Sequence, residues 1–289
     1  MEAPLQKVFQ QSVKPAVIEE WVDYYIFRRL AAFLVPWMAR MGHTPNQVSW
    51  LGLFFGFVTA WVFWKDHFFA GSVLLLWTVI LDCCDGMLAR FTGQMSPIGR
   101  IVDGTFDALW GTAVWFAIYF SGHFQRTGLD VFWLMSGAGL LMYLRCWTYD
   151  AVKTVYLSLC LPGFSEQDID YHEASVRMKQ SWKERKFFEA FIYAIMTGFQ
   201  YIFGRKDSSP LPLREGVRGR GAKALLDLPM RLWTFVGEGS HWALLIFFGL
   251  MTPLWDNALS IAFWLILIPM NLNWLIAFLL WRHRKGQLI

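Results

Sequence analysis

The chain is poor in charged residues and has no cysteine pattern that would indicate a zinc site or a disulfide framework. Charged residues make up 17% of its 289 residues, below the roughly 25% typical of soluble domains. The four cysteines lack paired spacing, so we interpret them as small apolar side chains. No apolar run adjoins the initial methionine, so a cleavable signal peptide is not expected. Internal repeats and low-complexity tracts are also lacking.

Apolar and aromatic side chains, in contrast, are abundant. Apolar residues make up 56% of the chain, and 17 Trp and 26 Phe contribute to an aromatic content of 18%. This composition is typical of a membrane protein. Long apolar stretches predict spans near residues 46–64, 69–91, from 98 onward, 131–157, 234–251 and 257–281. We therefore predict an all-α, polytopic membrane protein with six transmembrane helices and an N-terminal interfacial amphipathic helix.

Polar stretches divide the chain into four predicted segments. Residues 1–45 are a cytosolic N-terminus with the interfacial helix, and residues 46–157 are the first four transmembrane helices with the acidic motif. Residues 158–231 are a basic cytosolic insert, and residues 232–289 are the last two helices with a basic tail. Residues 20–40 alternate aromatic and charged side chains, which predicts a helix in the membrane interface with its arginines toward anionic headgroups. Within the insert, residues 187–204 are interpreted as a second interfacial helix, although a span is the alternative.

The distribution of basic residues sets the expected orientation. With the N-terminus in the cytosol, only Lys65 and Arg126 of the 26 basic residues fall in outer loops. Lys and Arg concentrate on the cytoplasmic side of membrane proteins. We expect a multi-pass protein of a bacterial inner membrane, rather than of the endoplasmic reticulum. The end of the second span and the start of the third span should face the cytosol.

Four carboxylates stand in strongly apolar sequence at these ends. Asp82 and Asp85 are three residues apart, so they share one face of a helix. Asp103 and Asp107 are four residues apart and share a face of the next helix. An ionisable residue in a membrane segment is costly and indicates a functional site. The four carboxylates would repel one another unless cations lay between them, and hard divalent ions prefer oxygen ligands. The sequence therefore predicts a metal site open to one face of the membrane.

The spacing of this stretch resembles the signature of the CDP-alcohol phosphotransferase family. That signature reads Asp-x2-Asp-Gly-x2-Ala-Arg-x8-Gly-x3-Asp-x3-Asp. Its eight fixed positions are all present here, at Asp82, Asp85, Gly86, Ala89, Arg90, Gly99, Asp103 and Asp107. Eight matches with correct gaps make a specific motif, which covers 26 residues of the chain.

The resemblance implies an enzyme of phospholipid biosynthesis that uses divalent metal ions. Such an enzyme moves a substituted phosphate group from a CDP-linked donor, CDP-diacylglycerol or a CDP-alcohol, to an alcohol or lipid-hydroxyl acceptor, and it releases CMP. The resemblance implies two Mg²⁺ or Mn²⁺ ions held by Asp82, Asp85, Asp103 and Asp107, with Asp107 also the catalytic base. Nucleotide or phosphate binding is implied for Gly86, Ala89, Arg90, Gly99 and, in the Pro45-Asn46 pair, Asn46. A homodimer in the lipid bilayer is also implied, and no nucleic acid is expected as a partner.

Several alternatives stay open from the sequence alone. Arg145 and Lys153 are candidates for binding the acceptor, but long basic side chains also extend toward the membrane interface. The lipid can be carried by either the donor or the acceptor. A membrane prenyltransferase also has aspartate-rich metal motifs, but its motifs lie far apart in sequence. A cation transporter could use the same carboxylates, but that function gives no reason for Arg90 or for the spacing of Gly99.

Overall fold

The chain folds into helices throughout the part that the structure describes. The computed structural model describes residues 8–122, 131–160, 171–187, 189–191, 193–194, 197, 220–255 and 258–287. No β-strand occurs in these ranges, which confirms the all-α prediction. The elements are η1 (Asp23–Phe27), α2 (Arg28–Arg40), α3 (Pro45–Trp64), α4 (Phe68–Thr92), α5 (Pro97–Phe120), α7 (Val131–Cys160), α8 (Tyr171–Lys183), α10 (Arg220–Trp233), α11 (Glu238–Leu250), α12 (Ala258–Leu267) and α13 (Pro269–Gly286).

The ends of α3, α4 and α5 are set by local sequence signals. Thr44 starts α3 in a capping box: its hydroxyl accepts from the Gln47 N–H at 3.3 Å, and the Gln47 side chain accepts from the Thr44 N–H at 2.9 Å. Gly93 ends α4 with a φ of +70°, a conformation that glycine adopts without strain. Ser96 then starts α5 by accepting from the Gly99 N–H at 2.9 Å. The connection between the two halves of the acidic motif is therefore short and well defined.

Helix α3 packs against both α4 and α5. Small residues permit the close approach. A Cβ atom placed on Gly56 would lie 2.4 Å from Cβ of Trp110 on α5, so only glycine fits there. One turn further along α3, the hydroxyl of Thr59 meets that of Thr78 on α4 at 3.2 Å. This packing fixes α4 relative to α5.

Long apolar helices and exposed aromatic side chains agree with a membrane protein. In the described residues, three helical stretches are long and apolar enough to span a membrane: Pro45–Trp64, Phe68–Thr92 and Ala258–Lys285. Helix α3 exposes a row of large apolar side chains, Trp50, Phe54, Phe57, Trp61 and Trp64. A soluble surface rarely exposes so many, whereas lipid solvates them well. The number of six spans stays a prediction.

The last two predicted spans are divided differently in the structure. Residues 220–233 form α10, and the next helix, α11, begins at Glu238 and not at 234. The predicted span 257–281 is two helices, because Pro269 cannot continue the hydrogen-bond ladder of α12. The Asn271 side chain donates to the Leu267 carbonyl at 2.6 Å and so satisfies backbone at this break.

The segment before α2 runs across the ends of other helices and ties them together. The Trp21 N–H donates to the Thr234 carbonyl at 3.1 Å, and the Tyr149 hydroxyl donates to the Ile18 carbonyl at 2.6 Å. The Glu20 carboxylate accepts from the Ser240 N–H at 3.1 Å and thereby caps the N-terminus of α11. Burial raises the pKa of Glu20 well above its usual range. The segment thus joins α11 to the rest of the bundle.

One arginine of the predicted interfacial helix forms an ion pair inside the protein. The Arg28 Nε donates to Glu19 Oε2 at 2.8 Å, and the two side chains are only 14% and 4% exposed. Burial alone would raise the pKa of Glu19, but Arg28 and the nearby Lys14, Lys153 and Arg90 hold it below the usual value. The same pairing raises the pKa of Arg28, against the effect of burial. Arg28 is thus neutralised within the protein, and the headgroup contacts expected for the arginines of this helix stay a prediction.

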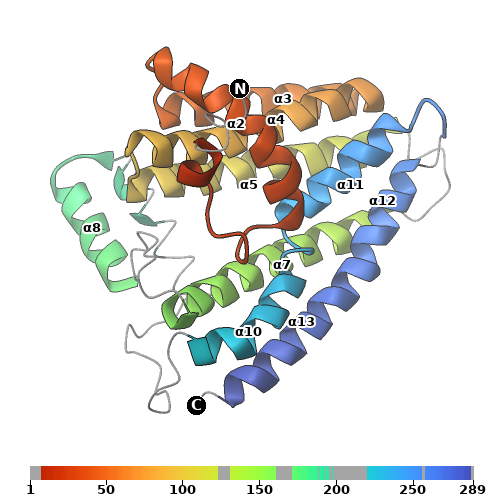
Figure 1. Cartoon of the computed structure of the whole chain (residues 1–289). Helices are drawn as coiled ribbons and strands as arrows, with labels where there is room; N and C mark the ends of the chain where they lie inside the picture. Colours follow the sequence, from red (N-terminus) through yellow and green to blue (C-terminus); the bar gives the residue numbers. More distant parts are fainter. Residues whose placement is uncertain are drawn as a thin grey trace.

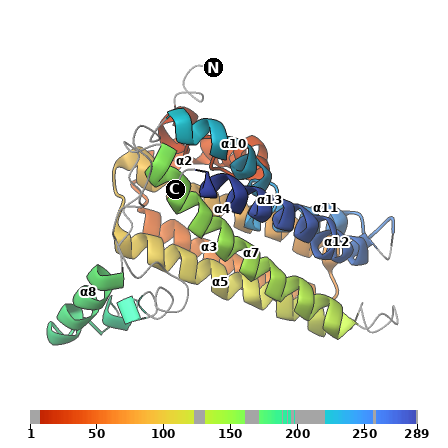
Figure 2. The same cartoon turned by 90° about the horizontal axis from the view of Figure 1, so that it is seen from below.

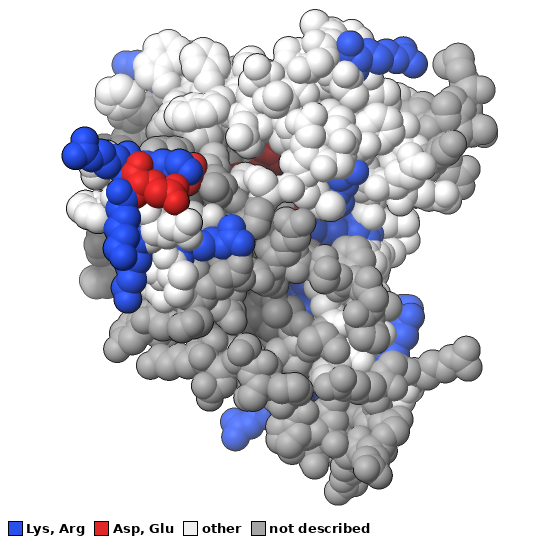
Figure 3. Space-filling view, turned by 90° about the vertical axis from the view of Figure 1, so that its left-hand side faces the viewer, with Lys and Arg blue, Asp and Glu red and all other residues white. Residues whose placement is uncertain are grey.

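Helix α8 projects away from the other helices in both views, and it belongs to the predicted basic insert (Figures 1 and 2). On the face in Figure 3, most of the exposed charged side chains that are described are Lys or Arg. Most of the predicted helix at 187–204 lies outside the described residues. Its interfacial position, like the four-segment division, stays a prediction.

We expect the Glu19–Arg28 pair to stabilise the fold. Glu19→Gln leaves a buried arginine without its counter-charge, which should cost about 3 kcal/mol. The pair contributes stability above about pH 4.5, the ordinary pKa of Glu19, and loses it as pH falls through the lowered pKa. Thermal unfolding in detergent at neutral pH measures the change.

A matched control is Glu184→Gln. Glu184 pairs with Lys186 at 2.8 Å, but the two side chains are 43% and 54% exposed. Exposed pairs contribute little to stability, so its midpoint should stay at that of the unsubstituted protein. Equal midpoints for both variants would contradict the structural role of Glu19.

Candidate metal centre

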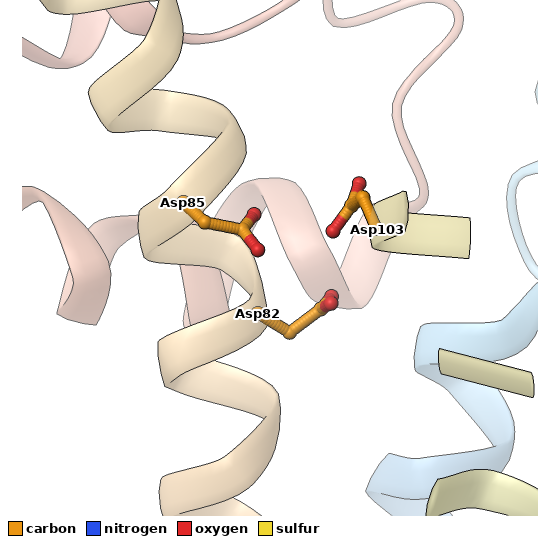
Figure 4. Close-up of side chains that lie close together, drawn as sticks. All are labelled: Asp82, Asp85 and Asp103. Atoms are coloured by element: carbon orange, nitrogen blue, oxygen red, sulfur yellow. The ribbon is translucent and has the colours of Figure 1, made fainter. Parts of the chain in front are cut away.

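Three carboxylates of the motif converge between α4 and α5. Asp82 and Asp85 lie one turn apart on α4, and Asp103 faces them from α5 (Figure 4). One oxygen of each carboxylate lies within 4.8 Å of the other two. Asp85 is buried, whereas Asp82 and Asp103 are half-buried. The sequence spacing therefore predicted the convergence of these three residues correctly.

The fourth carboxylate, Asp107, extends the cluster along α5. It lies one turn beyond Asp103 and interacts with Asp82 through their side chains. Its Oδ1 accepts a hydrogen bond from Nε1 of Trp110 at 3.2 Å. Asp85 and Asp103 make the corresponding side-chain contact across the two helices. The four carboxylates thus form two facing pairs.

One residue of the site comes from α3 and was not predicted. The Ser49 hydroxyl donates to Oδ2 of Asp85 at 2.6 Å, and both side chains are buried. A carboxylate that accepts such a bond is held in one orientation. Ser49 is 36 positions away from Asp85 in the chain and lies outside the motif, so only the packing of α3 against α4 reveals it.

The residues expected to bind nucleotide or phosphate lie beside the carboxylates. The Arg90 guanidinium folds back over Gly86, where an added Cβ would lie 3.5 Å from Nη2. Arg90 Nε also donates to the Ser12 carbonyl of the N-terminal segment. Ala89 is half-buried on the same turn of α4.

The starts of α3 and α5 bring a second group of these residues together. Asn46 is exposed, and its Oδ1 lies 3.5 Å from the place that a Cβ on Gly99 would occupy. That Cβ would also lie 2.9 Å from Oγ of Ser96, so a side chain at Gly99 would crowd the cap of α5. Asn46 and Gly99, which are far apart in the sequence, are therefore neighbours in the fold.

The two candidate acceptor residues lie in different surroundings. Arg145 is fully buried on α7, where Nη1 donates to the Ile266 carbonyl at 3.0 Å and Nη2 contacts Nε2 of His241. These partners belong to α12 and α11, so Arg145 links three helices. Lys153 is also buried and lies within electrostatic reach of Glu19. Acceptor binding by these two residues stays a prediction.

The donor set fits a hard divalent cation. All of its groups are carboxylates, at a separation that one ion or a pair of ions with bound water could bridge. Lys14, Arg28 and Arg90 lie within electrostatic reach of Asp103 and offset part of the negative charge. Mg²⁺ and Mn²⁺ both prefer oxygen ligands of this kind. Asp82, Asp85 and Asp103, with Asp107 next to them, are therefore suited to bind such ions.

Removal of the Ser49 hydroxyl tests the support that α3 gives to Asp85. We expect Ser49→Ala to weaken Mn²⁺ binding by about 10- to 100-fold, because a residue that orients a ligand typically contributes that much. Titration of the purified protein with Mn²⁺, read by the electron paramagnetic resonance of the free ion, measures the affinity.

Ser72→Ala is the matched control. Ser72 is buried on α4, and its hydroxyl has no hydrogen-bond partner in the described part of the chain. This variant should keep the affinity of the unsubstituted protein. If Ser49→Ala binds Mn²⁺ as well as Ser72→Ala does, Ser49 does not support a metal ligand.

Comparison with known proteins agrees with the motif. The sequence model of the CDP-alcohol phosphatidyltransferase family matches residues 42–158. An archaetidylinositol phosphate synthase of Pyrococcus horikoshii is 31% identical over 110 residues, which are 38% of this chain and 57% of that protein. A phosphatidylinositol phosphate synthase of Streptomyces avermitilis is 28% identical over 132 residues, 44% of this chain and 54% of that protein. The chain thus spans little more than half the length of these two relatives.

Proposed function

Residues 42–158 belong to the CDP-alcohol phosphatidyltransferase family, and on this basis we propose that the protein transfers a substituted phosphate group from a CDP-linked donor to an alcohol and releases CMP. The observation that carries the proposal is the convergence of Asp82, Asp85 and Asp103 within 4.8 Å. The family signature alone would not require these side chains to meet. Their convergence on two membrane helices gives the chemistry a site.

The proposed reaction needs neutralisation of a pyrophosphate and removal of one proton. Divalent ions held by the four aspartates would neutralise the phosphate oxygens and the leaving group. The alcohol oxygen forms a bond to the phosphorus distal to cytidine, and the bond from this phosphorus to the bridging oxygen breaks. That oxygen leaves with CMP. Asp107 accepts the hydroxyl proton as general base.

The remaining motif residues would bind and orient the donor. Arg90 offers the planar guanidinium that suits phosphate oxygens, and Gly86 beneath it leaves room for a close approach. Asn46 and Gly99 lie at the starts of α3 and α5, on the same side of the carboxylates as the exposed turn 93–96. Donor entry from the cytosol is consistent with the basic residues predicted for that side.

The proposed substrates follow from the names of the relatives. Two relatives are named as synthases of inositol phosphate lipids. Such names favour the mode in which the donor carries the lipid and the acceptor is a soluble alcohol. The alternative mode, with a soluble CDP-alcohol and a lipid acceptor, is kept as an outcome of the test.

The test measures CMP release by the purified protein. CDP-diacylglycerol, CDP-ethanolamine, CDP-choline and CDP-inositol are each supplied with lipid or soluble alcohol acceptors. We expect CMP from one class of donor, loss of activity in excess chelator and its return with Mg²⁺ or Mn²⁺. Full activity in chelator would reject the metal site. Cation flux without CMP release from any donor would instead support the transporter alternative.

Asp107→Asn tests the general base. Asparagine keeps an oxygen that can accept from Trp110 but cannot take the hydroxyl proton, so turnover should fall by roughly 10²- to 10⁴-fold. Asp227→Asn is the control, because Asp227 accepts from the Tyr156 hydroxyl on the other side of the bundle. Size-exclusion chromatography in detergent checks that both variants fold. Near-normal turnover by Asp107→Asn would count against its role as base.

A further inference from the structure

Two indole rings in tilted contact connect α5 to α11 next to the carboxylate cluster. The rings of Trp110 and Trp242 have their centroids 4.8 Å apart and their planes at 37°. Both side chains are buried. Trp242 lies outside residues 42–158, so this contact links the family segment to the C-terminal helices.

Each indole N–H is directed to a carboxylate on its own helix. Nε1 of Trp110 donates to Oδ1 of Asp107, and Nε1 of Trp242 donates to Oε1 of Glu238, both at 3.2 Å. The order of contacts is therefore Asp107, Trp110, Trp242, Glu238. One end is the proposed base, and the other is the first residue of α11.

Glycines hold both rings in place. Gly56 on α3 leaves room for Trp110, since a Cβ there would lie 2.4 Å from Cβ of the tryptophan. Gly111 on α5 does the same for Trp242, with a Cβ position 3.1 Å from Cζ2. Neither ring can shift toward these glycines without moving a helix. The donor to Asp107 consequently has a fixed position.

A buried tryptophan of this bundle does not need a partner for its N–H. Trp115 lies on the same helix as Trp110, is buried and packs against Phe263 with ring centroids 5.2 Å apart. Its Nε1 has no hydrogen-bond partner in the described part of the chain. The two indole–carboxylate bonds are thus a particular feature of the contact between α5 and α11.

We infer that Trp110 is a positioning residue for Asp107, and that Trp242 and Glu238 support it from α11. The inference rests on the proposed function, in which Asp107 takes the hydroxyl proton. The hydrogen bond to Oδ1 and the side-chain contact with Asp82 together hold the carboxylate in one orientation, in which it can accept the proton of the acceptor hydroxyl. Orientation of this kind affects the chemical step more than the binding of the donor.

The test compares Trp110→Phe with Trp115→Phe. The first substitution keeps an aromatic ring between Gly56 and Trp242 but removes the N–H donor. The second makes the same change on the same helix where the N–H has no partner. We expect Trp110→Phe to lower kcat by about 10²-fold with an unchanged KM for the donor, and Trp115→Phe to keep both values. Equal kcat values for the two variants, whether high or low, would overturn the inference.

Mn²⁺ binding gives a readout that is independent of turnover. Trp110→Phe leaves Asp82, Asp85 and Asp103 in place, so its Mn²⁺ stoichiometry, measured by electron paramagnetic resonance without substrate, should equal that of the unsubstituted protein. Loss of bound Mn²⁺ together with a lowered thermal midpoint would show a general structural role and would overturn the inference.

The support from α11 is tested at Glu238. Glu238→Gln keeps an oxygen that accepts from the Trp242 N–H, so this variant should retain most of kcat. Glu238→Ala removes that oxygen and should lower kcat, as Trp110→Phe does. Equal loss in both variants would show that the charge matters, and it would overturn the support proposed for Glu238.

An unsubstituted protein that releases no CMP overturns the proposed function itself. An active one whose Trp110→Phe variant is equally active overturns only this inference.

Discussion

Mutual repulsion among four carboxylates is the constraint on which the rest of this structure depends. Asp82, Asp85 and Asp103 bring an oxygen each within 4.8 Å, in helices whose outer surfaces are apolar. Ionised groups this close are tolerated in a low-dielectric environment only when opposite charge compensates them. Nearby cationic side chains supply part of that charge. Divalent ions and the phosphates they bind are the natural source of the remainder.

Rigid local geometry holds the carboxylates together against this repulsion. The left-handed Gly93 and the cap at Ser96 reverse the chain between α4 and α5 within a few residues. Helix α3 packs along both helices, and Ser49 donates from it to Asp85. The site is therefore built by three consecutive helices, and the close approach of Trp110 to Gly56 sets the distance between α3 and α5.

The sequence predicted the part of the site that follows from local periodicity. Spacing on a helix placed Asp82 beside Asp85, and the apolar run near 46–64 predicted α3. Residues that act through tertiary packing could not be found in this way. Ser49 and Trp242 look like ordinary helix residues until α3 and α11 are placed against their neighbours. The predicted span over 257–281 lies within a helical stretch long enough to cross a membrane, but the sequence analysis did not predict the break that Pro269 makes between α12 and α13.

The segment of residues 8–22 has a consequence for how the protein can be handled. Its carbonyl at Ser12 accepts from Arg90, its Glu20 carboxylate caps α11, and its Glu19 neutralises Arg28. A truncation that removes residues 8–22 would take away the carbonyl that holds Arg90 and uncap α11 in one step. Affinity tags are therefore better fused to the C-terminal tail, which follows α13 at the opposite end of the chain.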